Sequence, residues 1–233
     1  MPNVSIVPEP SLVIAIDGPS GSGKSSTARA LASALCMDYL DTGSMYRALA
    51  VWCTRQGIPA ADAGRVAAAA ATLPLGINTD PADFGVRLAG SDVTAQLHTP
   101  QVSGIVSGYA RIAEARGWLI ARMRQIIAER GRIVVEGRDI TTVVAPDAQV
   151  RVLLKADATA RIARRTAQLN GAADRVTVTD QVIGRDRVDA LTSDFEHPAH
   201  GVVVIDSTDL SLAQVVERIA GLVPAPLRHS PKR

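Results

Sequence analysis

Residues 13–26, VIAIDGPSGSGKSS, join an apolar run to a glycine- and serine-rich loop and then to a helical pattern. Residues 18–25, GPSGSGKS, fill the pattern GxxxxGK[ST], with branched apolar residues before it and an amphipathic repeat after it. In that context successive backbone N–H groups point inward at phosphate oxygens, and the helix that follows adds its N-terminal dipole. The stretch predicts a strand, a phosphate-binding loop and a helix at the start of an α/β fold.

The side chains of this loop have expected tasks in binding a nucleotide. Lys24 brings positive charge to the β- and γ-phosphates, and the Ser25 hydroxyl is the expected ligand of Mg²⁺. The glycines allow backbone angles that other residues avoid. The whole predicted ATP-binding set is Gly18, Pro19, Ser20, Gly21, Ser22, Gly23, Lys24, Ser25 and Ser26.

Apolar runs alternate with helical repeats along the rest of the chain, which predicts a parallel sheet with helices on both faces. One segment differs: GVRLAGSDV within 75–97 alternates and turns at Gly90, which predicts a small hairpin set apart from the main sheet. Ser211 and Gln214 form a capping box for a last helix. The strand candidates are 12–16, 132–136, 150–156 and 201–206, and the helix candidates are 24–36, 44–56, 62–73, about 100–130 and a last one to about 221.

Composition limits the classes of partner and compartment. The 233 residues are 47% hydrophobic and 21% charged with a net charge of +2, which is typical of a globular chain and gives no general case for nucleic-acid binding. Cys36 and Cys53 have no partner at metal-ligand spacing, so we expect reduced structural thiols. The sequence has no apolar run near 18 residues, and we expect a soluble cytoplasmic protein with no membrane contact.

The class of phosphate-loop protein follows from what accompanies the loop. No guanine-reading NKxD element occurs, and RIVVEG has one acid followed by glycine instead of the Asp-Glu that ends the strand of motor ATPases. Basic and acidic residues gather after predicted strands, where open α/β sheets bind ligands. This pattern favours transfer of phosphate to a second anionic substrate.

Four motifs in order carry a specific resemblance. IDGPSGSGKSS, DTGSMYR at 41–47, VVEGRD and RDRVD together resemble the bacterial cytidylate kinase family, over about 12–221. The resemblance implies ATP as donor, CMP and dCMP as acceptors, Mg²⁺, and a P-loop kinase fold with a five-stranded parallel sheet flanked by helices. It also implies a single kinase unit, which we expect to be a monomer. Its parts are a core over 12–74 and 101–221, a small α+β substrate-binding insert over 75–100, a short helical lid at about 161–190, and flexible termini at 1–11 and 222–233.

The same resemblance assigns residues that bind the acceptor's phosphate and sugar. Arg47 can make a forked contact to the 5′-phosphate. Asp41 and Thr42 lie at a strand-to-helix turn, where each either meets the acceptor or caps the helix. Tyr46 either packs beside the sugar or belongs to the core.

Ser107, Arg116 and Asp139 match the family's base-reading positions. Asp139 would accept from the exocyclic amine of cytosine, which uracil lacks, while Arg116 and Ser107 would serve the ring edge. Ser107 has an alternative interpretation as an ordinary surface serine. Arg138 points to phosphate, and Glu136 either holds water on Mg²⁺ or pairs with an arginine.

Arginines beyond the strand at 150–156 are expected to surround the transferred phosphoryl group. Arg161, Arg164 and Arg165 recur on consecutive turns of RIARRTAQ, and the last two match the family's lid positions best. Arg185 would bind a phosphate and Asp189 a sugar hydroxyl. The predicted catalytic set is Lys24, Arg138, Arg164 and Arg165.

Three positions depart from the family pattern. Thr192 and His98 stand where arginine is common, and Thr141 stands where glycine is common after GRD. We expect these departures to change details of ribose and phosphate binding and to leave the reaction the same. The alternatives are a P-loop kinase for another small acceptor, such as UMP, AMP or shikimate, and a nucleotide-sensing module without transfer.

Overall fold

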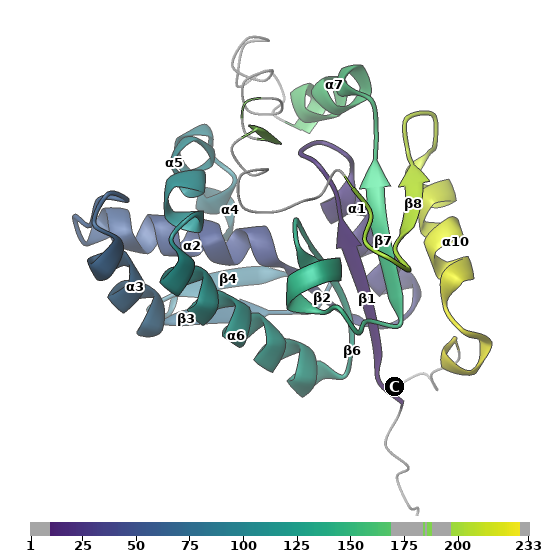
Figure 1. The fold of residues 1–233 in the computed structure, drawn as a ribbon, viewed down its shortest axis with the longest axis horizontal. Coiled ribbons are helices and arrows are strands. Elements are labelled where there is room, and N and C mark those ends of the chain that lie inside the picture. The colour runs from purple at the N-terminus through teal and green to yellow at the C-terminus, as the bar shows by residue number, and fades with distance from the viewer. Residues whose placement is uncertain (1–9, 169–183, 185, 188–196, 229–233) are drawn as a thin grey trace, which may run out of the picture.

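The computed structural model describes residues 10–168, 184, 186–187 and 197–228. Its centre is a five-stranded sheet in which all neighbours run parallel, in the order β2-β6-β1-β7-β8 (Figure 1). This confirms the predicted α/β fold with a parallel five-stranded sheet. The strands are β1 (Leu12–Asp17), β2 (Asp38–Asp41), β6 (Arg132–Gly137), β7 (Val150–Lys155) and β8 (Val203–Asp206).

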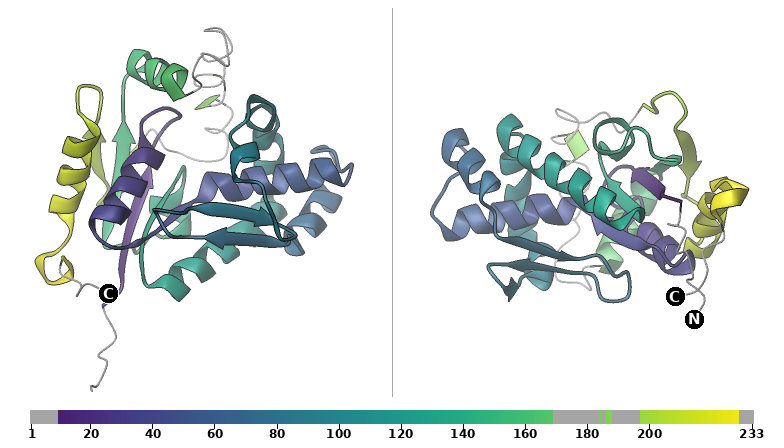
Figure 2. Two further views of the ribbon diagram at one scale, coloured as in Figure 1. Left: turned by 180° about the vertical axis from the view of Figure 1, so that it is seen from behind. Right: turned by 90° about the horizontal axis from the view of Figure 1, so that it is seen from below.

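Alternation along β1 explains how the sheet is covered on both faces. Ile14 and Ile16 point to one face and pack against α1 (Lys24–Ala34) and α10 (Leu212–Leu222). Ala15 points to the other face, into a second apolar cluster. That cluster is formed with α2 (Thr42–Arg55), α3 (Ala63–Ala71), α5 (Pro100–Ala110) and α6 (Ala113–Arg130), which lie on the β2 side of the sheet in Figures 1 and 2.

The segment expected to form a hairpin is a separate antiparallel sheet of three strands. It consists of β3 (Leu75–Asn78), β4 (Gly85–Leu88) and β5 (Ser91–Asp92). The predicted turn at Gly90 is confirmed: Ala89 and Gly90 have φ of 48° and 81° and link β4 to β5. Val86 and Leu88 pack against α2, together with α4 (Thr94–Leu97) and α5. The small sheet therefore shares a core with the helix that follows β2.

Near the C-terminus, the predicted capping box is confirmed, whereas the tail differs from its prediction. The capping box of α10 is present, with the Ser211 and Gln214 side chains each bonded to the other's backbone. The expected loose tail from residue 222 is instead ordered as far as Arg228, because Val223 is fully buried and Arg228 donates to the Val223 carbonyl at 2.7 Å. Arg132 ties the resulting short turn, η3 (Ala225–Leu227), to the body by donating to the Leu227 carbonyl.

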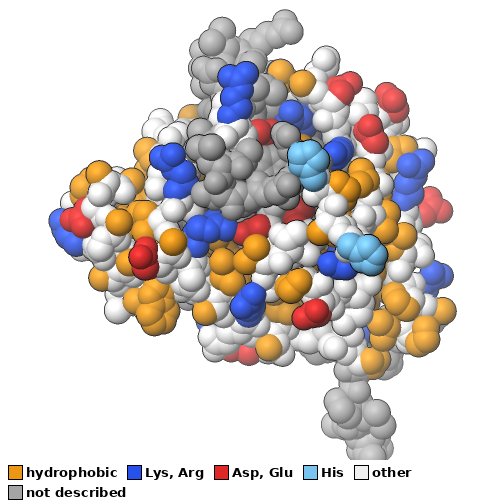
Figure 3. Space-filling view, viewed as in Figure 1, with side chains coloured by type: hydrophobic (Ala, Val, Ile, Leu, Met, Phe, Trp, Pro, Cys, Tyr) orange, Lys and Arg blue, Asp and Glu red, His pale blue; other side chains and the backbone are white. Residues whose placement is uncertain are grey.

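The surface and the thiols agree with a globular chain. On the face seen in Figure 3, basic and acidic side chains are interspersed rather than gathered into one basic field. Cys36 is exposed, Cys53 is buried, and neither forms a disulfide. Among the described helices, none has the length and apolar character needed to cross a membrane.

Candidate active site

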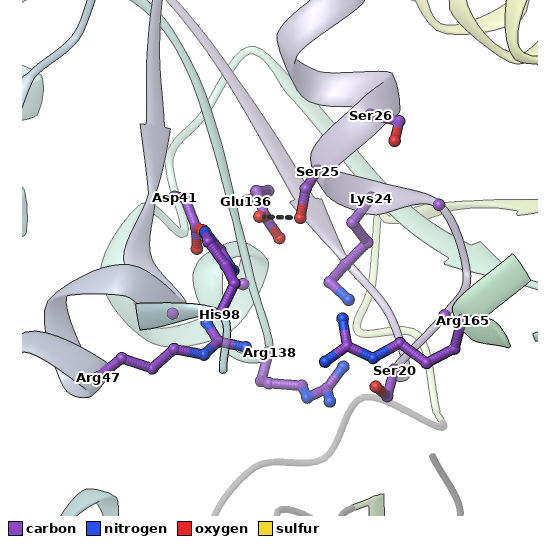
Figure 4. A pocket seen from close by; sticks show the side chains of 14 residues that line it. Ser20, Lys24, Ser25, Ser26, Asp41, Arg47, His98, Glu136, Arg138 and Arg165 are labelled. Atoms are coloured by element: carbon purple, nitrogen blue, oxygen red, sulfur yellow. Dashed lines mark hydrogen bonds between the residues drawn. The ribbon is translucent and has the colours of Figure 1, made fainter. Parts of the chain in front are cut away.

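A cavity of about 370 Å³ lies where β1, β2 and β6 end (Figure 4). Open parallel sheets bind ligands at this edge, because the loops that follow the strands meet there. Side chains from widely separated segments converge on it. Its lining residues are Ser20, Gly21, Gly23, Lys24, Ser25, Ser26, Asp41, Gly43, Arg47, His98, Glu136, Gly137, Arg138 and Arg165.

The loop between β1 and α1 forms one wall, as the sequence predicts. Gly21 has φ of 75°, and a Cβ there would lie 2.7 Å from the Arg161 carbonyl oxygen, so only glycine fits. Lys24 donates to the Pro19 carbonyl at 2.9 Å, which holds the ammonium group inside the loop. Six of the nine predicted loop residues line the cavity, and Gly18, Pro19 and Ser22 form the loop behind them.

Two buried carboxylates face the loop. The Ser25 hydroxyl donates to Glu136 Oε1 at 2.6 Å, across from Lys24. Burial, and then the nearby Asp41 carboxylate, raises the pKa of Glu136 to about 7, against the opposing effect of Lys24 and Arg47. A cation bound nearby would lower the pKa of Glu136 and favour its ionised form.

Asp41 ends β2 and caps α2. Its carboxylate accepts from the Ser44 backbone N–H at 3.0 Å and from the Ser44 hydroxyl at 2.6 Å. Burial acts to raise the pKa of Asp41, but Arg47, the Ser44 hydrogen bonds and His98 outweigh it, so the pKa lies below its ordinary value. Asp41 therefore both caps the helix and lines the cavity, whereas Thr42 is buried outside the lining and donates to the Glu136 carbonyl.

Two of the three predicted base-reading residues, Arg116 and Asp139, come together outside the cavity lining. Asp139 and Arg116 make a close ion pair, with both side chains largely buried. The Arg116 guanidinium lies 5.6 Å from the centre of the Tyr46 ring. The Tyr46 hydroxyl is buried, and among the described residues it has no hydrogen-bond partner. Burial raises the pKa of Asp139, and Arg116 opposes the shift. Ser107 is half-buried on α5.

Asp186 is a residue of the site that the sequence analysis missed. It accepts from the Ser20 backbone N–H at 2.8 Å and from Arg138 at 3.1 Å, and it pairs closely with Arg161. Arg138 also donates to the Gly18 carbonyl. The sequence does hold a signal for it, because Asp186 lies inside RDRVD between the predicted site residues Arg185 and Asp189.

The three arginines of α7 (Ala158–Gln168) separate in their contacts. Arg165 lines the cavity, and burial followed by the nearby Arg47 lowers its pKa. Arg164 instead donates to the Ser207 carbonyl at 2.6 Å and to the Ser207 hydroxyl at 2.9 Å. The structure brings Arg165 and Lys24 together (Figure 4). Arg164 lies between the segment after β8 and the phosphate loop, where it also donates to the Ser22 carbonyl at 3.4 Å. Predicted site residues Arg185 and Asp189, the departure Thr192 and most of the expected lid lie outside the described residues.

The other two departures are visible. His98 lines the cavity beside Arg47 and Asp41 (Figure 4). Thr141 is buried and donates its hydroxyl to Asp17 at 2.7 Å. His98 therefore belongs to the cavity, whereas Thr141 belongs to the buried contacts around Asp17.

The oxygen donors at the loop suit a hard cation that takes most of its ligands from water and phosphate. Ser25, Glu136 and Asp41 offer hydroxyl and carboxylate oxygens, which Mg²⁺ prefers. Within the described ranges, no group of three or more His, Cys, Asp or Glu side chains could hold a metal ion. The donor set fits a Mg²⁺ ion bound chiefly by phosphate oxygens and water.

Cationic side chains enter the cavity from four separate segments. Lys24 comes from the loop, Arg47 from α2, Arg138 from the end of β6 and Arg165 from α7. Four cations can neutralise more negative charge than a single anion bound at the phosphate loop would bring. The arrangement suits two phosphate groups that approach each other.

Comparisons with known proteins agree with this geometry. A family model described as Cytidylate kinase matches residues 14–225. A protein of Cutibacterium acnes described as cytidylate kinase is 53% identical over 93% of this chain and 98% of its own length. One of Corynebacterium glutamicum with the same description is 42% identical over 96% of this chain and 99% of its own length.

Proposed function

The chain belongs to the cytidylate kinase family, and we propose that it transfers the γ-phosphoryl group of ATP to CMP and dCMP, giving ADP and CDP or dCDP. The observation that carries this proposal is that the phosphate loop faces Arg47 and Arg138 within one cavity. A loop that only bound nucleotide would not need this second group of cations. The activity is that of an ATP:nucleoside-monophosphate phosphotransferase.

The donor occupies the loop side of the cavity. Backbone N–H groups within residues 21–25 hold the β- and γ-phosphates, and Lys24 adds its charge where negative charge develops. Ser25 would hold Mg²⁺ together with phosphate oxygens, and Glu136, which accepts from Ser25, would contact its water. When bound, the ion neutralises charge on the transferred group.

The acceptor phosphate lies opposite the loop. Arg47 and Arg138 orient it, and Arg165 reaches the group in transfer from α7. The acceptor oxygen attacks the γ-phosphorus, the bond to the β-phosphate oxygen breaks, and ADP leaves. No strong general base is needed, because a phosphate monoester, with a second pKa of about 6, is already ionised at neutral pH.

The acceptor base meets the Arg116–Asp139 pair. Asp139 accepts from the exocyclic amine of cytosine, and Arg116 and Ser107 serve the ring edge. The buried pair supports this role, as does the Tyr46 hydroxyl beside it, which has no hydrogen-bond partner in the described part of the chain, since buried polar groups without full hydrogen bonding favour a polar ligand. Thr42 and Asp41 border the sugar side.

Further roles are proposed for the lid and for the whole chain. Arg185 contacts a phosphate and Asp189 a sugar hydroxyl, and Arg164 steadies α7 through its bonds to Ser207. The protein acts as a monomer in the cytoplasm, as one kinase unit with its insert at 75–100. Light scattering of the purified protein measures its oligomeric state directly.

An acceptor panel tests the reaction. Purified protein with ATP and Mg²⁺ is offered CMP, dCMP, UMP, AMP and shikimate, and ADP formation is coupled to a spectrophotometric signal. We expect CMP and dCMP to give the highest kcat/KM, and Lys24→Ala to lose about 10²–10³-fold in rate while it stays folded. Preference for another acceptor would replace the assigned substrate, and no ADP with any acceptor would favour a nucleotide sensor.

A further inference from the structure

Asp17 is a buried carboxylate with no task in the transfer of phosphate described above. It is the last residue of β1, only 3% exposed, and lies outside the cavity lining. Its side chain faces η1 (Ile140–Val144), the single helical turn that follows β6. A buried carboxylate is costly unless its oxygens are satisfied, so its partners are informative.

Three donors from two consecutive residues meet this carboxylate. The Ile140 backbone N–H donates to Asp17 Oδ1 at 2.8 Å. The Thr141 backbone N–H and hydroxyl both donate to Oδ2, at 2.8 Å and 2.7 Å. Burial raises the pKa of Asp17, and these hydrogen bonds oppose the shift. A glycine at position 141 would supply only the backbone donor.

The bonded residues come directly after the two side chains assigned to the acceptor. Arg138 lines the cavity and Asp139 pairs with Arg116, and both project from the backbone that Ile140 and Thr141 hold in place. In the sequence, Asp17 directly precedes Gly18 of the phosphate loop, and the Gly18 carbonyl accepts a hydrogen bond from Arg138. The contacts thus join the start of the phosphate loop to the turn that presents the acceptor residues.

We propose that Asp17 and Thr141 are positioning residues for the acceptor, with the Thr141 hydroxyl fixing the turn from which Arg138 and Asp139 reach it. The proposal rests on the proposed function of Asp139. It assigns a task to a position where the sequence departs from the family it resembles. The consequence is a specific effect on acceptor binding, separate from any effect on ATP.

Removing the hydroxyl without changing side-chain shape tests the proposal. Thr141→Val should raise the KM for CMP about tenfold, the factor that corresponds to one charge-assisted hydrogen bond at the low end of its range. The KM for ATP should stay within about twofold, and the preference for CMP over UMP should fall, because Asp139 is no longer held in register. Thr141→Ala, which also lacks the hydroxyl and adds no volume, should give the same split.

Two variants serve as controls. Thr141→Ser keeps the hydroxyl and should restore near-parental KM values. Thr142→Val makes the same chemical change one residue later, at an exposed position, and should alter neither KM.

The proposal would be overturned if Thr141→Val and Thr141→Ala both had the same KM for CMP as Thr142→Val. Equal increases for CMP and ATP, which would indicate a general loss of structure, or a failure of Thr141→Ser to recover, would overturn it as well. A parental enzyme without activity on CMP in the same assay would instead refute the proposed function, so the two failures are distinguishable.

Discussion

Single residues decide which acceptor the site prefers and how strongly it binds. Asp139 lies between β6 and η1, Arg47 lies within α2, and the two are assigned to opposite ends of the acceptor. Asp139 is buried against Arg116, whereas Arg47 lines the cavity with Lys24. Substituting them should therefore produce different patterns in one assay.

Asp139→Ala should lower kcat/KM for CMP and narrow the preference for CMP over UMP. The variant loses the acceptor for the cytosine amine, a hydrogen bond worth on the order of 2–3 kcal/mol when one partner is charged. It also removes the carboxylate that would be left unpaired against UMP. Arg47→Ala is the matched comparison: it should lower kcat/KM for both acceptors and leave their ratio near the parental value. Equal losses on CMP and UMP in Asp139→Ala would remove Asp139 from the base site.

The stability of the ligand-free protein should depend on Glu136. Its pKa is raised from 4.5 to about 7, so the folded state keeps a proton that the unfolded chain releases. The contribution of Glu136 to the free energy of unfolding therefore falls as pH rises from about 4.5 to about 7, by on the order of 2–3 kcal/mol. In urea denaturation, Glu136→Gln should gain stability relative to the parent between pH 5 and pH 8. Glu114→Gln, at an exposed position on α6, should show no such change, and a pH-independent difference for Glu136→Gln would contradict the raised pKa.

At the scale of an element, α10 closes one face of the sheet and depends on its first turn. Ser211 accepts from the Gln214 backbone N–H at 3.3 Å, and the Gln214 side chain accepts from the Ser211 backbone N–H at 2.9 Å. Ser211→Ala should cost about 1 kcal/mol, which corresponds to a fall in Tm of about 2–4 °C for a chain of this size. Calorimetry measures this shift. Ser211→Asp keeps a side-chain acceptor and should retain most of the Tm, while an unchanged Tm in Ser211→Ala would show that packing alone holds the helix.

How far the elements follow from sequence depends on how local their causes are. β1, β6 and β7 are apolar runs buried on both faces, so their composition alone predicts them. β2 has only four residues with an aspartate at each end, and its apolar content is just Tyr39 and Leu40. Composition did not identify it as a strand, and only the motif that follows it implied one.

The site shows the same limit. Lys24 and Ser25 belong to a contiguous motif, and their position at the cavity could be predicted from it. Asp186 bonds to Ser20 across 166 residues of chain, and no local pattern indicates such a partner. The split between Arg164 and Arg165 depends on the segment after β8, since Ser207 captures one guanidinium and leaves the other at the cavity.

At the scale of the whole molecule, an apolar cluster around α2 joins the two sheets. Leu88 of β4 is 1% exposed and packs with Ala48 and Val51 of α2, which also covers the large sheet. We expect the insert and the core to unfold together.

Leu88→Ala should destabilise the whole protein by about 2–5 kcal/mol, because it leaves a cavity in that shared cluster. Tryptophan fluorescence and far-UV circular dichroism should report one coincident transition at a lower denaturant midpoint. Arg87→Ala changes the neighbouring, exposed position of the same strand and should leave the midpoint near its parental value. Two separate transitions in Leu88→Ala would show that the insert is an independent unit.

The strand order has a consequence for biosynthesis. β1 is made first, yet its two neighbours are β6, which begins at Arg132, and β7, which begins at Val150. During translation, both edges of this apolar strand therefore stay unpaired while more than a hundred residues are added. Strand pairs so distant in sequence form slowly. A nascent chain stalled before β6 should remain sensitive to protease and bind chaperones, whereas one extended past β8 should not. Ribosome-bound chains of increasing length would locate the point at which the sheet closes.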